Sequence, residues 1–267
     1  MSKTEILAII NQKGGVGKTT TAINLAAGIA LKNKKVLVID LDPQGNATTG
    51  LGISNSENSD QTVYAVLNGT KNILDVIKKS KFENLDIISS NVDLSGLEVE
   101  TAGDNRRAFI LKEQIMAYLN DYKGKYEYIL IDCPPSLSLL TVMALVASHS
   151  LVVPLQTEFF ALEGLTQLMK TIDRVKINLN SELKIKGILL TMYDKRNKLS
   201  GQVEKEARDY FKEKVYSTVI PRNVRLSEAP SHGVPVLVYD ETCPGSKSYF
   251  NFTEEFLSKK ENFESAA

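Results

Sequence analysis

The sequence predicts an α/β fold in which a mostly parallel, twisted sheet has helices on both faces. Short apolar runs rich in Val and Ile alternate with longer helical patterns along the chain. This alternation is typical of parallel strands joined by crossover helices. Several runs are also apolar at consecutive positions, as in Ile129-Leu130-Ile131 and Leu151-Val152-Val153. Strands of that kind are expected where helices cover both faces of the sheet.

The elements follow from these runs in order. The predicted strands are residues 6–11, 35–40, 86–90, 126–133, 150–156, 184–193 and 215–221. The predicted helices are residues 19–32, 106–119, 163–178, 201–214 and roughly 246–260. Residues 51–61 form the most polar, turn-like segment and are expected to be a surface loop. No repeat or long linker divides the chain, so we expect one domain over residues 1–267.

Composition excludes several classes of protein. The 267 residues include 32 Lys plus Arg and 32 Asp plus Glu, so no overall field draws the chain to nucleic acid or lipid. Cys133 and Cys243 are far apart and outside any C-x-x-C pattern, which argues against a disulfide framework or zinc site. No stretch approaches the ~20 apolar residues of a membrane span, and no secretory signal pattern is present. We therefore expect a cytoplasmic protein that does not bind membrane.

A glycine-rich loop follows the first predicted strand. It reads Lys13-Gly14-Gly15-Val16-Gly17-Lys18-Thr19-Thr20 and leads into a predicted helix. Backbone N–H groups in such a loop surround phosphates, and the helix N-terminus favours negative charge. Lys18 is expected to reach the β- and γ-phosphates, and the Thr19 hydroxyl to bind Mg²⁺. The sequence therefore predicts the P-loop NTPase fold with ATP and Mg²⁺ as ligands.

The loop departs from the strict P-loop pattern G-x-x-x-x-G-K-[ST]. Gln12 occupies the first glycine position, and Lys13 adds a second positive charge. Gly14, Gly15 and Gly17 supply the backbone freedom instead.

Three carboxylates follow two of the predicted strands. Asp40 and Asp42 end the second strand, and Asp132 ends the strand over residues 126–133. Ligands of open parallel sheets bind beyond the carboxyl ends of the strands, so these side chains can converge on the metal and the γ-phosphate. One carboxylate is needed to hold hydrated Mg²⁺, and another can position the attacking water. We expect Mg²⁺ near Thr19, Asp40, Asp42 and Asp132, with the three carboxylates acting through water.

Together these motifs resemble the ParA/Soj family of chromosome-partitioning ATPases, the deviant Walker-A group that also includes MinD. The resemblance covers essentially the whole chain. It rests on residues 13–20, on Asp40-Leu41-Asp42-Pro43-Gln44-Gly45-Asn46, on Asp132-Cys133-Pro134-Pro135, on residues 155–164 and on residues 219–230. The last two segments are more specific to this branch than the P-loop is.

The resemblance implies roles for single residues. Lys13 would be the signature lysine that reaches the nucleotide of a second protomer, and Gly14 would lie where two protomers approach closely. Asp42 would orient the hydrolytic water, and Asp132 would hold the magnesium shell. The resemblance also implies that Pro221 and Asn223 contact the adenine.

It further implies a cycle in which an ATP-bound homodimer binds nucleoid DNA without sequence preference. Weak intrinsic hydrolysis would be stimulated by a ParB-like centromere-binding protein. The glycine-rich loop begins about a dozen residues from the first residue, so we expect no helix-turn-helix domain before it.

The region from residue 194 to 225 is locally basic, with nine basic and five acidic residues. Residues 205–214 are expected to form a solvated helix with paired charges. Arg196, Arg222 and Arg225 are expected in loops near strand ends, where they would contact DNA phosphates. No aromatic residue is adjacent to any of these three arginines in the sequence, which favours backbone contact over base recognition.

Three other functions remain open at this stage. A MinD-like ATPase of division-site placement would bind membrane through its C-terminal helix, but Glu254, Glu255 and Glu261 make the polar side of that segment poorly basic. An electron carrier of the nitrogenase-reductase type would need two suitably placed cysteine ligands. A nucleotide or metabolite kinase would need an acceptor pocket and lid arginines, for which no motif is present.

Overall fold

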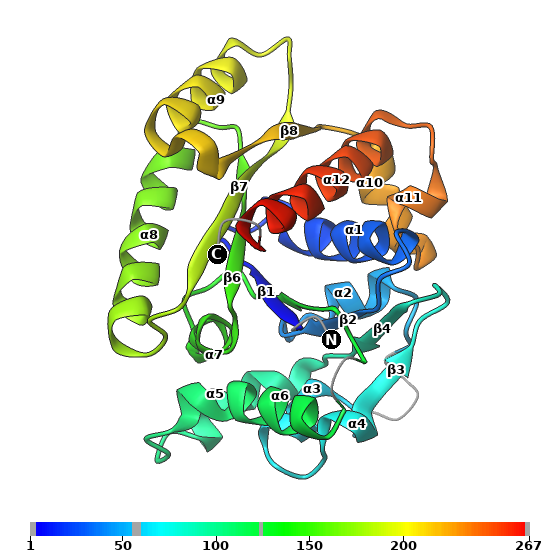
Figure 1. The fold of residues 1–267 in the computed structure, drawn as a ribbon, viewed down its shortest axis with the longest axis vertical. Coiled ribbons are helices and arrows are strands. Elements are labelled where there is room, and N and C mark those ends of the chain that lie inside the picture. The colour runs from blue at the N-terminus through cyan, green and yellow to red at the C-terminus, as the bar shows by residue number, and fades with distance from the viewer. Residues whose placement is uncertain (1–3, 55–59, 123–124, 265–267) are drawn as a thin grey trace.

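The computed structural model describes residues 4–54, 60–122 and 125–264. One eight-stranded sheet runs through this part of the chain, in the order β3-β4-β2-β5-β1-β6-β7-β8 (Figure 1). β3 pairs with β4 antiparallel and all other neighbours are parallel. The strands are β1 Glu5–Ile9, β2 Val36–Asp40, β3 Ile77–Lys79, β4 Leu85–Ile88, β5 Tyr128–Asp132, β6 Ser150–Gln156, β7 Lys184–Tyr193 and β8 Val215–Pro221. The predicted fold class is confirmed.

Helices cover both faces of this sheet (Figure 1). The longer ones are α1 Lys18–Leu31, α6 Ile110–Asp121, α7 Leu139–Ala147, α8 Ala161–Asn178, α9 Lys198–Phe211 and α12 Pro244–Glu264. The shorter ones are α2 Asn46–Gly50, α3 Val63–Leu67, α4 Ile73–Val76, α5 Leu97–Glu100, α10 Val224–Glu228 and α11 Val236–Tyr239. Short 3₁₀ turns span Val92–Gly96, Arg107–Phe109, Lys212–Lys214 and Ala229–His232.

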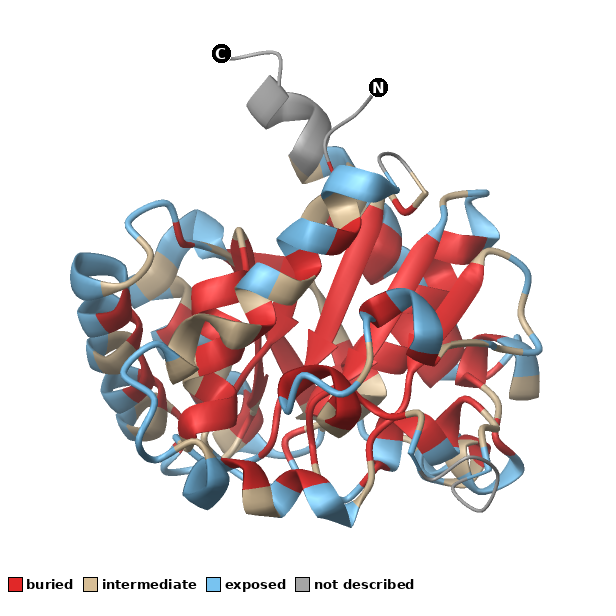
Figure 2. Ribbon diagram, turned by 90° about the horizontal axis from the view of Figure 1, so that it is seen from below, coloured by how far each residue is buried: buried red, intermediate tan, exposed pale blue. Residues whose placement is uncertain are grey.

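The pleat of the strands divides the core into two layers. Along β1, Ile6 and Ala8 pack with α6, α7 and α8 on one face. Leu7 and Ile9 pack with α1, α11 and α12 on the other face. All four side chains are buried, and Figure 2 shows the sheet as the most buried part of the molecule. This burial on both faces is why the strand sequences are apolar at consecutive positions.

All seven predicted strands are present. The helix α7, which is buried along most of its length, and several smaller elements were not predicted. β3 has three residues, and α2, α3, α4 and α5 have four or five each. Such short elements complete too little of a periodic pattern to be recognised in the sequence. The predicted surface loop over residues 51–61 lies partly outside the described residues.

The last helix is docked against the P-loop helix. Tyr249, Phe252 and Phe256 of α12 are buried, and the Tyr249 hydroxyl lies 3.0 Å from the Thr21 hydroxyl of α1. A Cβ on Gly28 of α1 would lie 2.2 Å from the Thr253 hydroxyl oxygen, so only glycine allows this approach. Within the described residues, no helix is long and apolar enough to cross a membrane.

Candidate functional site: a phosphate loop above a buried carboxylate pair

The P-loop connects β1 to α1 at the carboxyl edge of the sheet. Gly15 and Gly17 adopt left-handed backbone conformations, with φ of 74° and 89°. Gly17 is the residue immediately before α1. Residues with a Cβ are strained at these angles, which explains glycine at both positions. Val16 between them is buried, and its carbonyl accepts a 2.8 Å hydrogen bond from the Thr191 hydroxyl.

Lys18 begins α1 with its side chain buried. Its ammonium donates a 2.9 Å hydrogen bond to the Lys13 carbonyl. Burial lowers the pKa of Lys18, and the nearby carboxylates of Asp132 and Asp42 oppose that shift. Burial has removed most of the water around the Lys18 ammonium. A phosphate bound in front of the loop would therefore stabilise its charge.

Asp40 and Asp132 end adjacent parallel strands and are register partners. Both are fully buried. Asp40 accepts hydrogen bonds from the backbone N–H and hydroxyl of Thr48, at 2.8 and 2.7 Å. Burial is the main cause that raises the pKa of Asp40 to about 6, and the bonds from Thr48 oppose it. Asp40 is therefore held by Thr48 within the protein, and its predicted water-mediated contact with Mg²⁺ stays a prediction.

Asp132 differs from Asp40 in its hydrogen bonding. Among the described residues, neither of its carboxylate oxygens accepts a hydrogen bond of good geometry, although the Thr19 hydroxyl lies close enough to favour the ionised form. Burial, followed by repulsion from Asp40, raises the pKa of Asp132 well above its usual value. A buried carboxylate without a partner is costly, and a cation bound next to Thr19 would remove that cost.

These residues fit Mg²⁺ bound together with a nucleotide. In the described part of the chain, no group of three or more His, Cys, Asp or Glu side chains is arranged to hold a metal alone. Mg²⁺ does not require such a cage, because it keeps several waters and takes oxygens from one or two protein ligands and from phosphates. Thr19 and Asp132 offer these ligands beside the phosphate loop. Asp42 is largely buried, and its side chain accepts a 3.0 Å hydrogen bond from the Gln44 N–H.

A cavity of about 470 Å³ opens in front of the loop. Its lining includes the predicted residues Gly14, Gly15, Gly17, Lys18, Thr19, Thr20 and Asp42. It also includes Ile23, Asn46, Thr49, Pro135, Met192, Pro230 and Ser231, which were not predicted as site residues. Three of these, Asn46, Pro135 and Pro230, lie within the sequence segments that carry the family resemblance. That membership was the one signal by which they could have been predicted as site residues.

Lys13 behaves differently from Lys18. Its side chain is half exposed, and its ammonium forms an ion pair with Glu158 in the loop between β6 and α8. The Lys13 backbone N–H is held by the Asn11 side chain at 3.0 Å. Glu158 was not predicted as a site residue. It lies within residues 155–164, one of the segments that carry the family resemblance, but it is far from Lys13 in the sequence.

Pro221 and Asn223 do not line the cavity in front of the P-loop. Pro221 ends β8 and lines a second cavity with Tyr193, Asp194 and Arg222. The Asn223 side chain caps α10, where it accepts a 3.0 Å hydrogen bond from the Arg225 N–H. Their predicted contact with adenine therefore stays a prediction.

The three predicted DNA-binding arginines are exposed. Arg196 and Arg222 line the same cavity. Arg196 pairs with Asp194 at 3.1 Å. Arg225 does not line that cavity and pairs with Glu228 at 2.7 Å and Asp240 at 3.5 Å. The structure thus brings two of the three arginines together.

Known proteins resemble this chain over most of its length. A profile of the AAA domain family matches residues 4–185. The chain is 52% identical to the chromosome partitioning protein ParA of Caulobacter vibrioides, over 98% of this chain and 97% of the relative. It is 51% identical to the sporulation initiation inhibitor protein Soj of Bacillus subtilis, over 94% of this chain and 97% of the relative.

Among solved structures, the septum site-determining protein MinD of Pyrococcus horikoshii, complexed with Mg-ADP, has a TM-score of 0.77 and 28% identity. That match covers 94% of this chain and 95% of MinD. The higher identity over nearly full length lies with the partitioning proteins. The chain therefore belongs to the ParA/Soj family of chromosome-partitioning ATPases.

Proposed function

We propose that this chain is an ATP-gated switch for chromosome or plasmid partitioning. ATP and Mg²⁺ bind at the P-loop, two protomers close around two nucleotides, and the dimer binds DNA without sequence preference. Hydrolysis, slow in the chain alone, is stimulated by a ParB-type partner and releases the DNA. The observation that carries this proposal is the convergence of buried Lys18, Asp132 and Asp42 at one phosphate loop.

The residues divide the chemistry of this site. The N–H groups of the P-loop and the Lys18 ammonium bind the phosphates, which stabilises the negative charge that develops during phosphoryl transfer. Thr19 and Asp132 would hold the magnesium shell. Asp42, whose carboxylate is fixed by the Gln44 N–H, orients the attacking water. Mg²⁺ when bound supplies charge neutralisation between the phosphates.

Several exposed groups support the proposed dimer. Lys13 is half exposed at the edge of the site rather than buried in it. Leu137, Phe159 and Phe160, in the loops after β5 and β6, are 42%, 74% and 64% exposed. Apolar side chains gathered at one edge of a sheet are typical of an interaction surface, and this edge is where the nucleotide would lie.

Exposed arginines support the proposed DNA contact. Arg222 is exposed and lines the same cavity as Arg196. Arg196 is paired with Asp194, and a DNA phosphate can replace Asp194 as its partner. Backbone contact of this kind predicts binding that weakens with salt, with a slope of about 0.9 per neutralised phosphate. A cytoplasmic, nucleoid-associated protein would follow from such binding.

The deciding experiment measures ATP hydrolysis with and without plasmid DNA and a ParB-type partner, for the wild type and for Asp42→Ala. We expect the partner and DNA together to accelerate the wild type. Removing the group that orients the water should lower the stimulated rate by about 10²- to 10⁴-fold while ATP binding persists. Equal rates in all conditions would contradict the switch.

The MinD-like alternative is separated by co-sedimentation with liposomes and with plasmid DNA in the presence of ATP. The apolar stripe of α12 is already used, since Tyr249, Phe252 and Phe256 are buried against the core. We therefore expect ATP-dependent sedimentation with DNA and none with liposomes. Liposome binding without DNA binding would favour the MinD-like function.

A further inference from the structure

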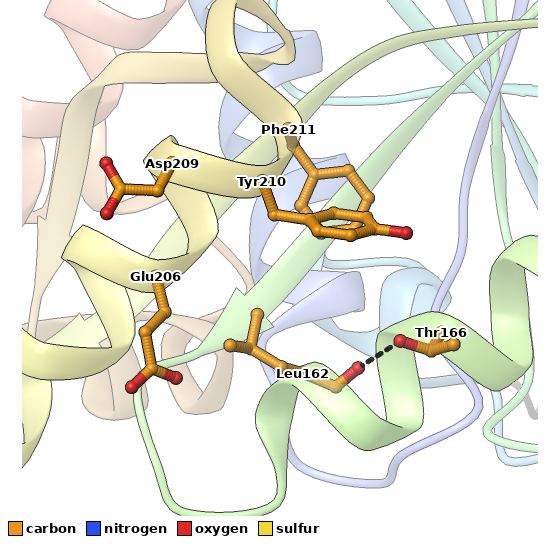
Figure 3. A pocket seen from close by; sticks show the side chains of 6 residues that line it. All are labelled: Leu162, Thr166, Glu206, Asp209, Tyr210 and Phe211. Atoms are coloured by element: carbon orange, nitrogen blue, oxygen red, sulfur yellow. Dashed lines mark hydrogen bonds between the residues drawn. The ribbon is translucent and has the colours of Figure 1, made fainter.

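A third hollow surface, a groove, lies between α8 and α9 (Figure 3). Leu162 and Thr166 of α8 line one side. Glu206, Asp209, Tyr210 and Phe211 of α9 line the other. The groove has a volume of about 440 Å³, which is enough for one or two aliphatic side chains. None of its lining residues belongs to the nucleotide cavity.

The walls of this groove are apolar. Leu162 and Phe211 are partly buried and pack against the main core. The Tyr210 ring is 74% exposed and meets the Phe211 ring edge to face, with centroids 4.7 Å apart. The Thr166 hydroxyl donates a 2.8 Å hydrogen bond to the Leu162 carbonyl (Figure 3), so its proton is not available to a ligand. A concave apolar surface with polar groups at its border is typical of a ligand or peptide site.

The border of the groove is acidic. Glu206 accepts a 2.9 Å hydrogen bond from the Gln202 amide, and across the described residues neither Glu206 nor Asp209 has a salt bridge. No Lys or Arg of the described chain lines the groove. Glu204 on the same helix differs, because it pairs with Arg208 at 2.9 Å. The two carboxylates at the groove thus leave their charge available to a cationic partner.

We propose that this groove is the docking site of a peptide segment that carries Lys or Arg on either side of an aliphatic residue. The aliphatic side chain would fill the space between Leu162 and Tyr210, and the flanking cations would pair with Glu206 and Asp209. The proposal rests on the proposed function in one respect, since it assigns this segment to the partner that stimulates hydrolysis.

The first turn of α8 connects the groove to the nucleotide site. Glu158, which pairs with Lys13, lies just before Ala161, the first residue of α8. The Ala161 N–H donates a 3.0 Å hydrogen bond to the Glu158 carbonyl. Leu162 is the next residue, so a peptide in the groove contacts the same helical turn that positions the partner of Lys13. Docking there can change the Lys13–Glu158 contact and with it the freedom of Lys13.

The test uses synthetic peptides labelled with a fluorophore and read by anisotropy. One has a Leu flanked by Lys and Arg, a second has the same Leu flanked by Glu, and a third has Ser in place of Leu. The full chain is measured as the wild type, as Glu206→Gln/Asp209→Asn and as Tyr210→Ser. The control, Glu98→Gln/Glu182→Gln, removes the same charge from two exposed positions elsewhere.

We expect the basic Leu peptide to bind the wild type more tightly than the other two. Loss of two partly exposed ion pairs should raise its Kd about three- to thirtyfold in the groove double variant, and not in the control. Tyr210→Ser should weaken binding without a change in far-ultraviolet circular dichroism. Equal binding by the double variant and the control, or equal binding of the Glu-flanked peptide, would overturn the proposal.

A stimulation assay separates this inference from the proposed function. With the ParB-type partner, the groove double variant should need a correspondingly higher partner concentration for half-maximal stimulation, at an unchanged basal rate. No stimulation of the wild type would mean that the proposed function has failed. Stimulation that the double variant leaves unchanged would mean that the groove inference has failed. A double variant that loses DNA binding or self-association instead would assign the groove to those contacts and overturn the proposal.

Discussion

The carboxyl edge of the sheet carries charged residues in two regions, which differ in burial and in ion pairing. At β1, β2 and β5, Lys18, Asp40 and Asp132 are buried, and Asp132 lacks a hydrogen-bond partner of good geometry within the described residues. At β7 and β8, Arg196 and Arg225 are exposed and paired with acidic side chains close in sequence or space. The first region is electrostatically incomplete, and the second is already satisfied.

This difference decides how much each region says about ligands. Burying charge without a partner costs several kcal/mol, so its presence beside a phosphate loop indicates a ligand that compensates it. Exposed ion pairs contribute about 0–1 kcal/mol each, and DNA phosphates could replace them at little cost. The nucleotide site therefore follows from the geometry, whereas DNA contact is a proposal.

The largest effect should come from Lys18→Ala. If Lys18 binds the phosphates as we propose, removing this buried cation should weaken ATP binding about 100-fold. Titration with a fluorescent ATP analogue measures this, with Lys205→Ala, an exposed lysine of α9, as the control. A loss of less than about fivefold, roughly 1 kcal/mol, would mean that the first region is not the phosphate site.

Lys13→Ala should act on assembly more than on nucleotide binding. We expect it to weaken ATP-dependent dimerisation about tenfold, because the charge-assisted hydrogen bond that we propose between Lys13 and the second protomer's phosphates could no longer form. Glu158→Gln should strengthen ATP-dependent dimerisation by about two- to fivefold, since it removes the ion pair that holds Lys13 in the monomer. Sedimentation velocity with ATP checks both, and an unimpaired Lys13→Ala dimer would exclude the role across the interface.

Asp132→Asn should change the free energy of unfolding in opposite directions without and with Mg²⁺ and ATP, relative to the wild type. Without nucleotide we expect the free energy of unfolding to rise by about 1 kcal/mol, because a buried carboxylate next to Asp40 is removed. In the presence of Mg²⁺ and ATP, the variant should lose most of the stabilisation that the wild type gains. Urea unfolding in both conditions measures this, and a less stable variant without ligand would show that Asp132 is satisfied in the free protein.

The smallest effect should come from Arg222→Ala. We expect DNA affinity to fall about threefold, with the salt dependence shallower by about 0.9 for each phosphate that the variant no longer neutralises. Arg106→Ala, an exposed arginine on a distant segment that pairs with Glu113, is the control. If both variants bind DNA alike, Arg222 is not a DNA contact.

Much of the fold and the core of the nucleotide site could be predicted from the sequence. Strands buried on both faces must be apolar at consecutive positions, and Asp40 and Asp132 interrupt those runs where the strands end. The glycines with positive φ also have few alternatives. These signals are local, so one sequence is enough to read them.

The remaining features depend on contacts between distant segments. Nothing in the sequence places Glu158 next to Lys13 or Met192 beside the phosphate loop, since one depends on the path of the loop after β6 and the other on the end of β7. The segment over residues 205–214 was expected to be a solvated helix with paired charges. In the structure, Glu206 and Asp209 instead lie beside an apolar groove. The sequence could not show this groove, because it depends on how α8 packs beside α9.

The close approach of Gly28 to Thr253 has a consequence for the order in which the protein becomes functional during synthesis. The outer side of the P-loop helix is covered by α12, whose first residue, Pro244, follows every strand of the sheet in the sequence. Until α12 is synthesised, Thr21 and Gly28 lack the contacts that Tyr249 and Thr253 make with the P-loop helix. A nascent chain can therefore contain all eight strands before α12 is synthesised, and we expect its ATP binding to improve once α12 packs against α1.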